Sequence, residues 1–325
     1  MKNKKVLFIG IGFYDYDKSI IDEFEKTGYT VDYFSEVPPR NLKQRFFLRT
    51  KNKKKINDIN SLHTNSIIRK SGDNYDYVFI IKCENLSILD INNLKDKSPE
   101  AKFILYLWDS INRIDQIKTK IYLFDKVYSF DTLDCLSNNS LIFNPLFFRD
   151  VYDNKNSNTN FVFDIYHLGW YHSDRLVLIK KLVKYLDQNN ITHKINLYTG
   201  YFNYLYQSLM GFKLKGFKKY LIFKPIESSD NFNNMMIAKS VLDIAHPLQS
   251  GLTMRTIELL GMRRKIITTN TDIINYDFYH PNNILVINRE NPFFDISFFE
   301  SDYFFVSDEI RSKYSISNWL KRMIN

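Results

Sequence analysis

The sequence of 325 residues predicts an α/β protein made of two domains, each built on a parallel sheet. Two observations lead to this prediction. Short apolar runs alternate with longer amphipathic segments in both halves of the chain, a rhythm typical of parallel strands joined by crossover helices. Between the halves, residues 153–160 form a polar, Asn-rich stretch of the kind that links domains.

The first half begins with a strand at 6–9, the turn Gly10-Ile11-Gly12, and a helix at 19–27 that ends before Gly28. A polar segment that precedes 103–107 is expected to be helical. The remaining predicted strands of this half are 30–34, 77–81, 103–107, 126–129 and 141–143.

The second half repeats the pattern with a strand at 164–168, a helix at 175–188 and a strand at 194–198. The sheet is expected to continue through strands at 241–245, 266–268 and 284–287. The C-terminal stretch 307–323 has the spacing of a helix.

Composition places the chain among ordinary globular proteins, with 44% hydrophobic and 25% charged residues. The sequence contains no apolar run of about 18 residues, so we expect no transmembrane helix. The basic start is followed by too few apolar residues for a signal-peptide core. Cys83 and Cys135 have no metal-ligand spacing and suggest no disulfide framework, which fits a reducing cytosol.

The most informative segment is 249–261, a small-residue turn and helix between two apolar strands. Ser250 or Thr253 can cap the helix, and Gly251 lets the backbone approach a ligand closely. Amide groups at a helix start attract anions, above all phosphate. Glu258, in the helix, suits the hydroxyls of a ribose. The alternative is an ordinary βαβ unit with a capped helix and an exposed Glu.

This segment resembles the donor-nucleotide motif of GT-B glycosyltransferases, in particular the CgeB-like and group 1 bacterial enzymes that build capsule, O-antigen and exopolysaccharide. In that pattern a small-residue turn holds the diphosphate and a Glu in the next helix holds the ribose. The matching residues are Ser250, Gly251, Leu252, Thr253 and Glu258. Further segments that resemble this group are 107–110, 127–131, 144–148, 168–169, 268–270 and 276–279.

The resemblance implies a GT-B fold, with two facing Rossmann-like domains and a C-terminal crossover helix. It implies an acceptor domain at 1–152, a nucleotide-sugar domain at 161–305, and a helix at 306–325 that returns to the first domain. The implied activity moves a sugar from a nucleotide-sugar donor to a lipid-linked surface polysaccharide or lipopolysaccharide. We expect a hexosyltransferase-like, metal-independent enzyme without a cofactor.

For the donor diphosphate, the resemblance places a basic residue after the first strand of the second domain, where Arg175 stands. Arg255 competes for this role, and a surface arginine is the alternative for either. Residues 224–229 lie where the nucleobase is usually bound. The pair His246-Pro247 resembles one in bacterial sialyltransferases, so a CMP-sugar donor stays open.

On the acceptor side, Gly10 and Gly12 end the first strand, where ligands of open α/β sheets bind. The third glycine of a dinucleotide fingerprint is absent, so we interpret this turn as an acceptor or cleft loop. Asp109, after a buried strand, is the first candidate for a general base and Asp15 the second. Asp109 could instead cap the next helix, and a retaining enzyme would need no such base.

Asp15-Tyr16-Asp17 has the Asp-x-Asp spacing with which GT-A glycosyltransferases hold a divalent metal. The motif follows a single strand rather than a complete nucleotide-binding half-domain. We therefore expect an acidic helix start here, favoured by the helix dipole, and no metal site.

The net charge of +9 and the basic segment 40–55, with apolar residues inside it, predict contact with an anionic membrane surface. The predicted location is cytoplasmic, peripheral on the inner face of the cell membrane. A solvated loop is the alternative for this segment. No nucleic-acid motif accompanies it, so no nucleic-acid partner is expected. The rival functions are a non-catalytic sugar-nucleotide-binding protein and a basic nucleic-acid-associated protein.

Overall fold

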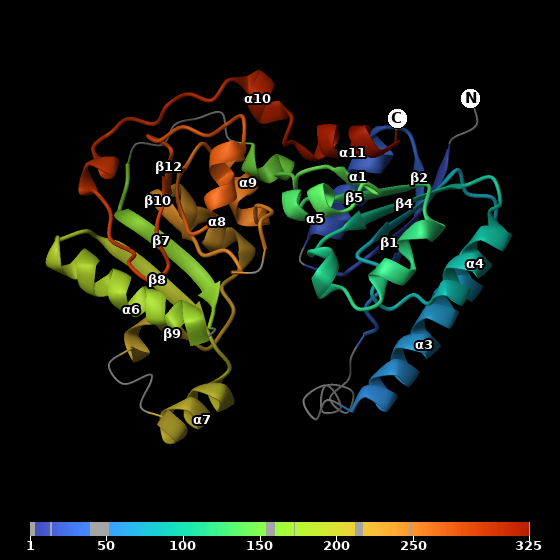
Figure 1. The fold of residues 1–325 in the computed structure, drawn as a ribbon, viewed down its shortest axis with the longest axis horizontal. Helices are drawn as coiled ribbons and strands as arrows, with labels where there is room; N and C mark the ends of the chain where they lie inside the picture. Colours follow the sequence, from blue (N-terminus) through green and yellow to red (C-terminus); the bar gives the residue numbers. More distant parts are fainter. Residues whose placement is uncertain are drawn as a thin grey trace. The chain divides into compact units, whose positions relative to one another are not determined.

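The computed structural model describes residues 4–13, 15–39, 52–153, 160–171, 173–211, 217–247 and 249–324. The described residues form two compact units, each built on a six-stranded sheet whose strands all run parallel (Figure 1). Unit 1 contains Met1–Arg149 and Tyr314–Asn325, and unit 2 contains Asp150–Lys313. The predicted α/β class with two parallel-sheet domains is confirmed.

The sheet of unit 1 has the strand order β2-β1-β3-β4-β5-β6. The order changes direction between β1 and β3, which is the switch point where open α/β sheets bind ligands. The strands are β1 (Lys5–Gly10), β2 (Thr30–Ser35), β3 (Tyr77–Ile81), β4 (Lys102–Leu107), β5 (Lys126–Ser129) and β6 (Leu141–Phe143). The helices are α1 (Tyr16–Lys26), α3 (Lys53–Lys70), α4 (Ile88–Lys97), α5 (Thr132–Ser137) and α11 (Ile316–Ile324), with 3-10 turns η1 (Ile111–Arg113), η2 (Ile117–Thr119) and η3 (Ile121–Leu123).

Helices cover both faces of this sheet because both faces of its strands are apolar. On one face Leu7 and Ile9 share a core with residues of α3 and α4. On the other face the ring of Phe79 lies 5.8 Å from Phe24 of α1 and 5.9 Å from Trp319 of α11. Figure 1 shows α11, at the red end of the chain, beside α1.

The sheet of unit 2 has the order β12-β11-β10-β7-β8-β9, the strand order of dinucleotide-binding folds with its switch point between β7 and β10. The strands are β7 (Phe163–Trp170), β8 (His193–Tyr198), β9 (Leu221–Ile222), β10 (Ala238–Asp243), β11 (Lys265–Thr268) and β12 (Ile284–Val286). The helices are α6 (Ser173–Gln188), α7 (Tyr201–Gly211), α8 (Ser228–Met236), α9 (Met254–Gly261) and α10 (Asp308–Ser312), with 3-10 turns η4 (Asp150–Tyr152), η5 (Lys218–Tyr220), η6 (Thr271–Asn275) and η7 (Ile296–Phe299).

The core of unit 2 also has two layers around its sheet. Ile165 of β7 and Leu242 of β10 pack with Ile179 and Leu182 of α6. Helices α8 and α9 pack against β10, and α9 also contacts β11. The switch-point ends of β7 and β10 are thus held by a rigid scaffold.

The predicted C-terminal helix is only partly right, because 307–323 forms two helices, α10 and α11. Between them the chain pairs with Phe148, whose amide donates to Tyr314 O (2.8 Å) and whose carbonyl accepts from Ile316 N (3.1 Å). These bonds, within unit 1, interrupt the helical hydrogen bonding. The strand predicted at 241–245 ends earlier, at Asp243. The helices α3, α5, α7 and α8 and the short strand β9 were not predicted.

Among the described residues, no helix is long and apolar enough to cross a membrane.

Candidate functional site

The predicted donor residues of the second half lie at the switch point of the unit 2 sheet. Arg175 lies in α6, directly after β7, and the segment Ser250–Glu258 follows β10. In parallel sheets of this order, ligands bind outside the carboxyl ends of the strands that flank the switch point.

The start of α9 is tied to the end of β10 by hydroxyl groups. Thr253 is the N-cap, and its Oγ1 accepts from Thr256 N (3.2 Å). The hydroxyls of Thr253 and Thr256 both donate to Oδ2 of the buried Asp243, at 2.6 and 2.8 Å. Of the two predicted caps, Thr253 is therefore right, and Ser250 lies before the helix.

The turn before α9 is held by Asn270, which lies after β11. Its Nδ2 donates to Ser250 O (2.8 Å) and Gly251 O (3.2 Å). Gly251 and Leu252 are buried, and Ser250 is half-buried. The buried amide of Asn270 thus fixes the conformation of the small-residue turn rather than leaving it as a free loop.

Two guanidinium groups contact the end of β10, and a third lies close enough to act on His167 of β7. Arg175 Nη2 donates to Ile244 O (3.0 Å), and Arg289 Nη2 donates to Ala245 O. Arg255 lies half-buried in the first turn of α9. The structure therefore brings the two predicted diphosphate residues to the switch point and adds Arg289. Such a cluster beside a helix start favours an anionic ligand.

His167 lies beneath these arginines as a neutral imidazole. Its Nδ1 lies 2.8 Å from Leu242 O, so Nδ1 carries the proton and Nε2 has the lone pair. Burial, followed by the charge of Arg255, lowers the pKa of His167 to about 3. A Cβ on Gly169 would come within 2.7 Å of Nε2, so this position accepts only glycine without a shift of the imidazole. Nε2 has no hydrogen-bond partner among the described residues.

Glu258 is buried, with 6% of its surface exposed. It lies in the second turn of α9, one turn beyond Met254. Of the alternative, a βαβ unit with a capped helix and an exposed Glu, the exposed Glu is therefore wrong and the capped helix is present. Burial of a carboxylate is costly unless charge or hydrogen bonds compensate for it, and this position lies in the same short helix as Arg255.

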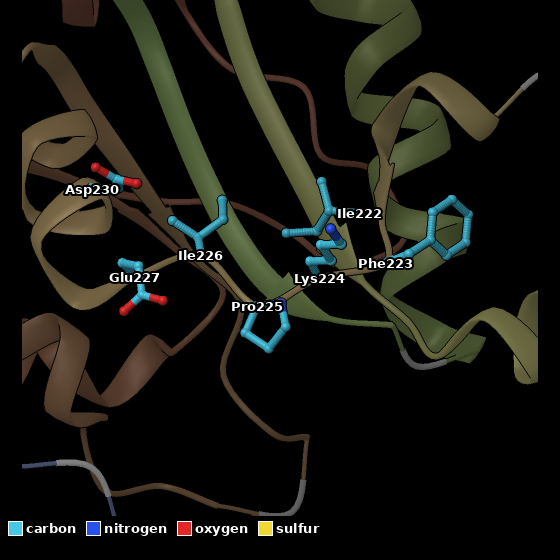
Figure 2. A pocket seen from close by; sticks show the side chains of 7 residues that line it. All are labelled: Ile222, Phe223, Lys224, Pro225, Ile226, Glu227 and Asp230. Atoms are coloured by element: carbon cyan, nitrogen blue, oxygen red, sulfur yellow. The ribbon is translucent and has the colours of Figure 1, made fainter.

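A cavity of about 520 Å³ opens where β9 leads into α8 (Figure 2). Its lining residues are Ile222, Phe223, Lys224, Pro225, Ile226, Glu227 and Asp230. Figure 2 shows the carboxylates of Glu227 and Asp230 on one side and the ring of Phe223 on the other. Glu227 occupies the N-cap position of α8 without a side-chain capping bond. The cavity thus coincides with the segment that the resemblance associates with the nucleobase.

In unit 1, the turn of Gly10 and Gly12 encloses an internal carboxylate. Asp17 Oδ2 accepts from Gly12 N (2.5 Å) and from the Tyr33 hydroxyl (2.7 Å). A Cβ on Gly10 would lie 2.5 Å from Asp17, and Gly12 has φ +64°. Burial raises the pKa of Asp17, and the bonds from Tyr33 and Gly12 oppose that shift. Asp17 therefore occupies the place next to the turn that a phosphate would take in a dinucleotide site.

The Asp-x-Asp motif is divided in space. Asp17 is buried in the turn, whereas the side chain of Asp15 is 70% exposed and lies 3.9 Å from Arg149. Arg149 in turn lies over the ring of Tyr16, with its Cζ 4.6 Å from the ring centroid. In the part of the chain that the structure describes, no group of three or more His, Cys, Asp or Glu residues could hold a metal.

Asp109 lies after β4 and is held by two cations. Oδ2 lies 3.3 Å from Lys82 Nζ, and Oδ1 lies 3.2 Å from Arg113 Nη1. The alternative that Asp109 caps the following turn is wrong, because Asp134 Oδ2 accepts from Ile111 N (2.6 Å) instead. The side chain of Asp109 is 26% exposed, so a hydroxyl group from solvent or a ligand can reach it.

Sequence reasoning missed several residues of these sites, namely Lys82, Arg113, His167, Asp243 and Arg289. His167 carried a signal, since it is a polar residue inside the apolar run 165–168. Lys82 carried a similar signal, because it directly follows an apolar strand. Asp109 follows the next apolar strand after one intervening residue, Trp108. The partners of His167 and Lys82 become visible only when neighbouring strands are aligned.

Most of the basic segment, residues 40–51, lies outside the described residues. Lys53, Lys54 and Lys55 are exposed in the first turn of α3, where Asn52 Oδ1 accepts from Lys55 N (3.2 Å). Cations at a helix start are unfavourable for the helix dipole, so these lysines do not serve the stability of α3.

The fold resembles that of several solved structures, among them a galactosyltransferase and an epimerase. Anabaena HepE, solved with UDP and glucose, aligns with a TM-score of 0.58 at 11% identity, over 98% of each chain. The lipopolysaccharide outer core galactosyltransferase WaaB aligns with a TM-score of 0.50 at 13% identity, over 98% of this chain and 97% of that chain. The UDP-GlcNAc 2-epimerase of Methanocaldococcus jannaschii, solved with UDP-GlcNAc and UDP, aligns with a TM-score of 0.51 at 12% identity, over 99% and 93%.

No protein-family model matches the chain, and no curated protein sequence matches it significantly. The structural similarities, together with the two parallel six-stranded sheets of the described residues, show the fold. The chain has the GT-B fold, with two Rossmann-like units.

Proposed function

We propose that this protein is a glycosyltransferase that takes a sugar from a nucleotide-sugar donor bound to unit 2. One observation carries the proposal. Arg175 contacts the end of β10, and Arg255 lies in the first turn of the capped helix α9, near His167 and in the same helix as the buried Glu258. The GT-B fold and its similarity to HepE, solved with UDP and glucose, support it.

In this proposal the guanidinium groups of Arg175 and Arg255 bind the donor diphosphate, and Glu258 accepts hydrogen bonds from the ribose hydroxyls. The turn Ser250-Gly251-Leu252, with Thr253, brings the backbone against the diphosphate. The cavity at the start of α8 lies in the segment associated with the base. Preorganised cations stabilise the charge that develops on the leaving diphosphate.

The reaction proceeds by attack of an acceptor hydroxyl oxygen on the anomeric carbon of the donor sugar. As that bond forms, the bond from the anomeric carbon to the diphosphate oxygen breaks, and the nucleoside diphosphate leaves with the electron pair. Asp109 takes the proton of the hydroxyl, with Asp15 as the second candidate. Gly10 and Gly12 shape the acceptor side. Because arginines balance the diphosphate charge, activity should survive a chelator, whereas strict dependence on Mg²⁺ or Mn²⁺ would contradict this assignment.

The acceptor in this proposal is a lipid-linked glycan of a surface polysaccharide, such as capsule or lipopolysaccharide. The resemblance of the sequence motifs and the similarity to WaaB support this choice. The basic segment 40–55 would hold the protein on the cytoplasmic face of the cell membrane, with each cation contributing about 1 kcal/mol. Replacing Lys51, Lys53, Lys54 and Lys55 with Ser should reduce sedimentation with anionic liposomes and leave nucleotide binding intact.

The proposal is tested by thermal shift with UDP, dTDP, GDP, ADP and CMP, followed by assays of donor hydrolysis. A ligand that binds the native state raises the melting temperature. Glu258→Ala should weaken the binding of whichever nucleotide raises the melting temperature, by roughly 1.5 to 3 kcal/mol of binding free energy. This is the value of a hydrogen bond to a charged group. Glu300→Ala, at an exposed carboxylate of the same unit, is the control and should bind as the wild type does. Absence of a shift with every nucleotide would refute the proposal.

A second candidate function, sugar-nucleotide epimerisation, is favoured by the similarity to the archaeal UDP-GlcNAc 2-epimerase. The two activities differ in their products. A transferase without an acceptor releases free nucleoside diphosphate slowly, whereas an epimerase changes the stereochemistry of the sugar at one carbon. Proton NMR of UDP-GlcNAc incubated with the protein separates these outcomes.

A further inference from the structure

The loop after β3 has an unusual backbone at the switch point of unit 1. Lys82 has φ +69° and Cys83 has φ +57°, so two consecutive residues with side chains adopt the left-handed region. Cys83 N donates to Ile81 O (2.9 Å), which closes a γ-turn of the strained hand with Lys82 at its centre. Such strain persists only where surrounding contacts impose it, and it concentrates at functional sites.

Lys120 imposes this conformation through the loop carbonyls. Its side chain is buried, with 3% exposure. Nζ donates to Cys83 O (2.8 Å), Glu84 O (3.2 Å) and Leu86 O (2.8 Å). All three ammonium hydrogens therefore have an acceptor within one short loop.

Glu36 holds the same loop through its amides. It is fully buried, and its Oε1 accepts from Asn85 N (2.5 Å) and Leu86 N (3.0 Å). Burial raises the pKa of Glu36, while those amide bonds and the charge of Lys120 oppose the shift. Two buried ionisable groups thus make most of their contacts to one loop, an expensive arrangement that stability alone does not require.

This support positions the side chain of Lys82. Its Nζ lies 2.8 Å from Glu84 Oε2 and 3.3 Å from Asp109 Oδ2. Burial opposes the charge, but the ion pairs with Glu84 and Asp109 outweigh burial and raise the pKa of Lys82. Lys82 therefore remains a cation next to Asp109.

We propose that Lys82 is a positioning residue that orients the carboxylate of Asp109 for proton transfer from the acceptor hydroxyl. The inference rests on the proposed transferase function. Lys82 and Arg113 hold the two oxygens of Asp109 separately, so its carboxylate cannot rotate without breaking an ion pair. Each oxygen keeps a further lone pair for the hydroxyl group.

The test compares three substitutions of Lys82 in the full-length protein. Lys82→Met should lower kcat about 10-fold or more while the KM for the donor stays within about twofold, because misorientation affects the chemical step. Lys82→Arg should restore most of kcat, since it keeps the cation. Lys82→Gly should raise the melting temperature by relieving the left-handed strain, and it should still lose activity as Lys82→Met does.

Asn74→Gly is the matched control for strain relief. Asn74 has φ +57°, is exposed, and lies before β3 rather than after it. The melting temperature of Asn74→Gly should rise less than that of Lys82→Gly, because Asn tolerates the left-handed backbone region better than Lys does. The kcat of Asn74→Gly should stay at the wild-type value. Two results would overturn the proposal. One is a wild-type kcat in Lys82→Gly, and the other is a loss of donor affinity in Lys82→Met as large as its loss of kcat.

Glu36 gives an independent test in which the charges around Asp109 stay unchanged. Glu36→Gln keeps an oxygen acceptor for the two loop amides and should keep kcat. Glu36→Ala removes that acceptor, so a folded variant should lose kcat with an unchanged donor KM. Wild-type turnover by folded Glu36→Ala would overturn the link between loop and site. If wild-type protein binds no sugar nucleotide and transfers no sugar, the proposed function itself fails, and that result is separate from these variants.

Discussion

The switch points of the two sheets show how one architecture can favour different ligands. In unit 2, Arg175, Arg255 and Arg289 gather at the switch point near the neutral His167. In unit 1, the turn after β1, which corresponds to the turn after β7 in unit 2, already contains the carboxylate of Asp17. The other charges of the unit 1 edge are paired, as in the contacts among Lys82, Glu84, Asp109 and Arg113. The first arrangement suits an anion, and the second suits a hydroxyl-bearing molecule.

The largest expected effect tests the unit 1 side of this comparison. Asp109→Asn should lower kcat by about 10² to 10⁴-fold, the usual contribution of a general base, with little change in donor KM. The amide keeps the shape of the side chain but cannot take the proton. Near-normal turnover in steady-state assays would contradict Asp109 as the general base. It would indicate either that Asp15 is the base or that the reaction is a retaining one.

The next effect concerns the neutral His167 of unit 2. Its pKa is lowered from 6.5 to about 3 in the folded protein, so the unfolded chain binds the extra proton between these pH values. The stability that the neutral His167 contributes is therefore complete above about pH 6.5 and is lost as the pH decreases toward 3, by roughly 5 kcal/mol.

His167→Asn removes this titration while an amide NH₂ can still donate to Leu242 O. The difference in unfolding free energy between the wild type and this variant should therefore narrow as pH falls, as measured by urea unfolding at pH 7, 5 and 4. Parallel pH profiles of the two proteins would show that His167 titrates normally.

A smaller effect concerns the arginines. Arg175→Gln and Arg255→Gln should each weaken the binding of a nucleoside diphosphate, because each removes charged hydrogen bonds to phosphate. The expected loss is about 1.5 to 3 kcal/mol of binding free energy, roughly 10- to 100-fold in affinity. Affinity for the matching nucleoside, which has no phosphate, should not change in calorimetric titrations.

Lys181→Gln is the control, since it removes an exposed cation of α6 whose Nζ donates to Glu290 O. If all three variants lose the same affinity, net charge rather than the switch-point cluster determines binding.

The sequence predicted the strands better than the helices, for a physical reason. Parallel strands covered on both faces, such as 77–81, are continuous apolar runs. Helix α3 escaped prediction because only Thr64 and Ile67 are buried along it, so its apolar periodicity is weak. The break between α10 and α11 depends on pairing with Phe148, far away in sequence.

The candidate donor site was visible in the sequence because most of it is contiguous, from Ser250 to Glu258. The capping by Thr253 followed from known helix preferences. The roles of Lys82, His167 and Asp17 depend on contacts between separate strands and helices. Asp17, for instance, lies in the first turn of α1 as expected, but nothing in the sequence indicated that its carboxylate accepts a hydrogen bond from Gly12 in the turn before it.

The support of the 82–86 loop has a consequence for evolution and engineering. Lys120 and Glu36 bind backbone atoms of this loop, so its shape is nearly independent of which side chains it carries outward. The exposed Glu84 can then be exchanged without loss of the loop conformation. A library randomised at position 84 should therefore yield mostly folded proteins, and under the proposed function this edge of unit 1 is a place where acceptor preference can diverge.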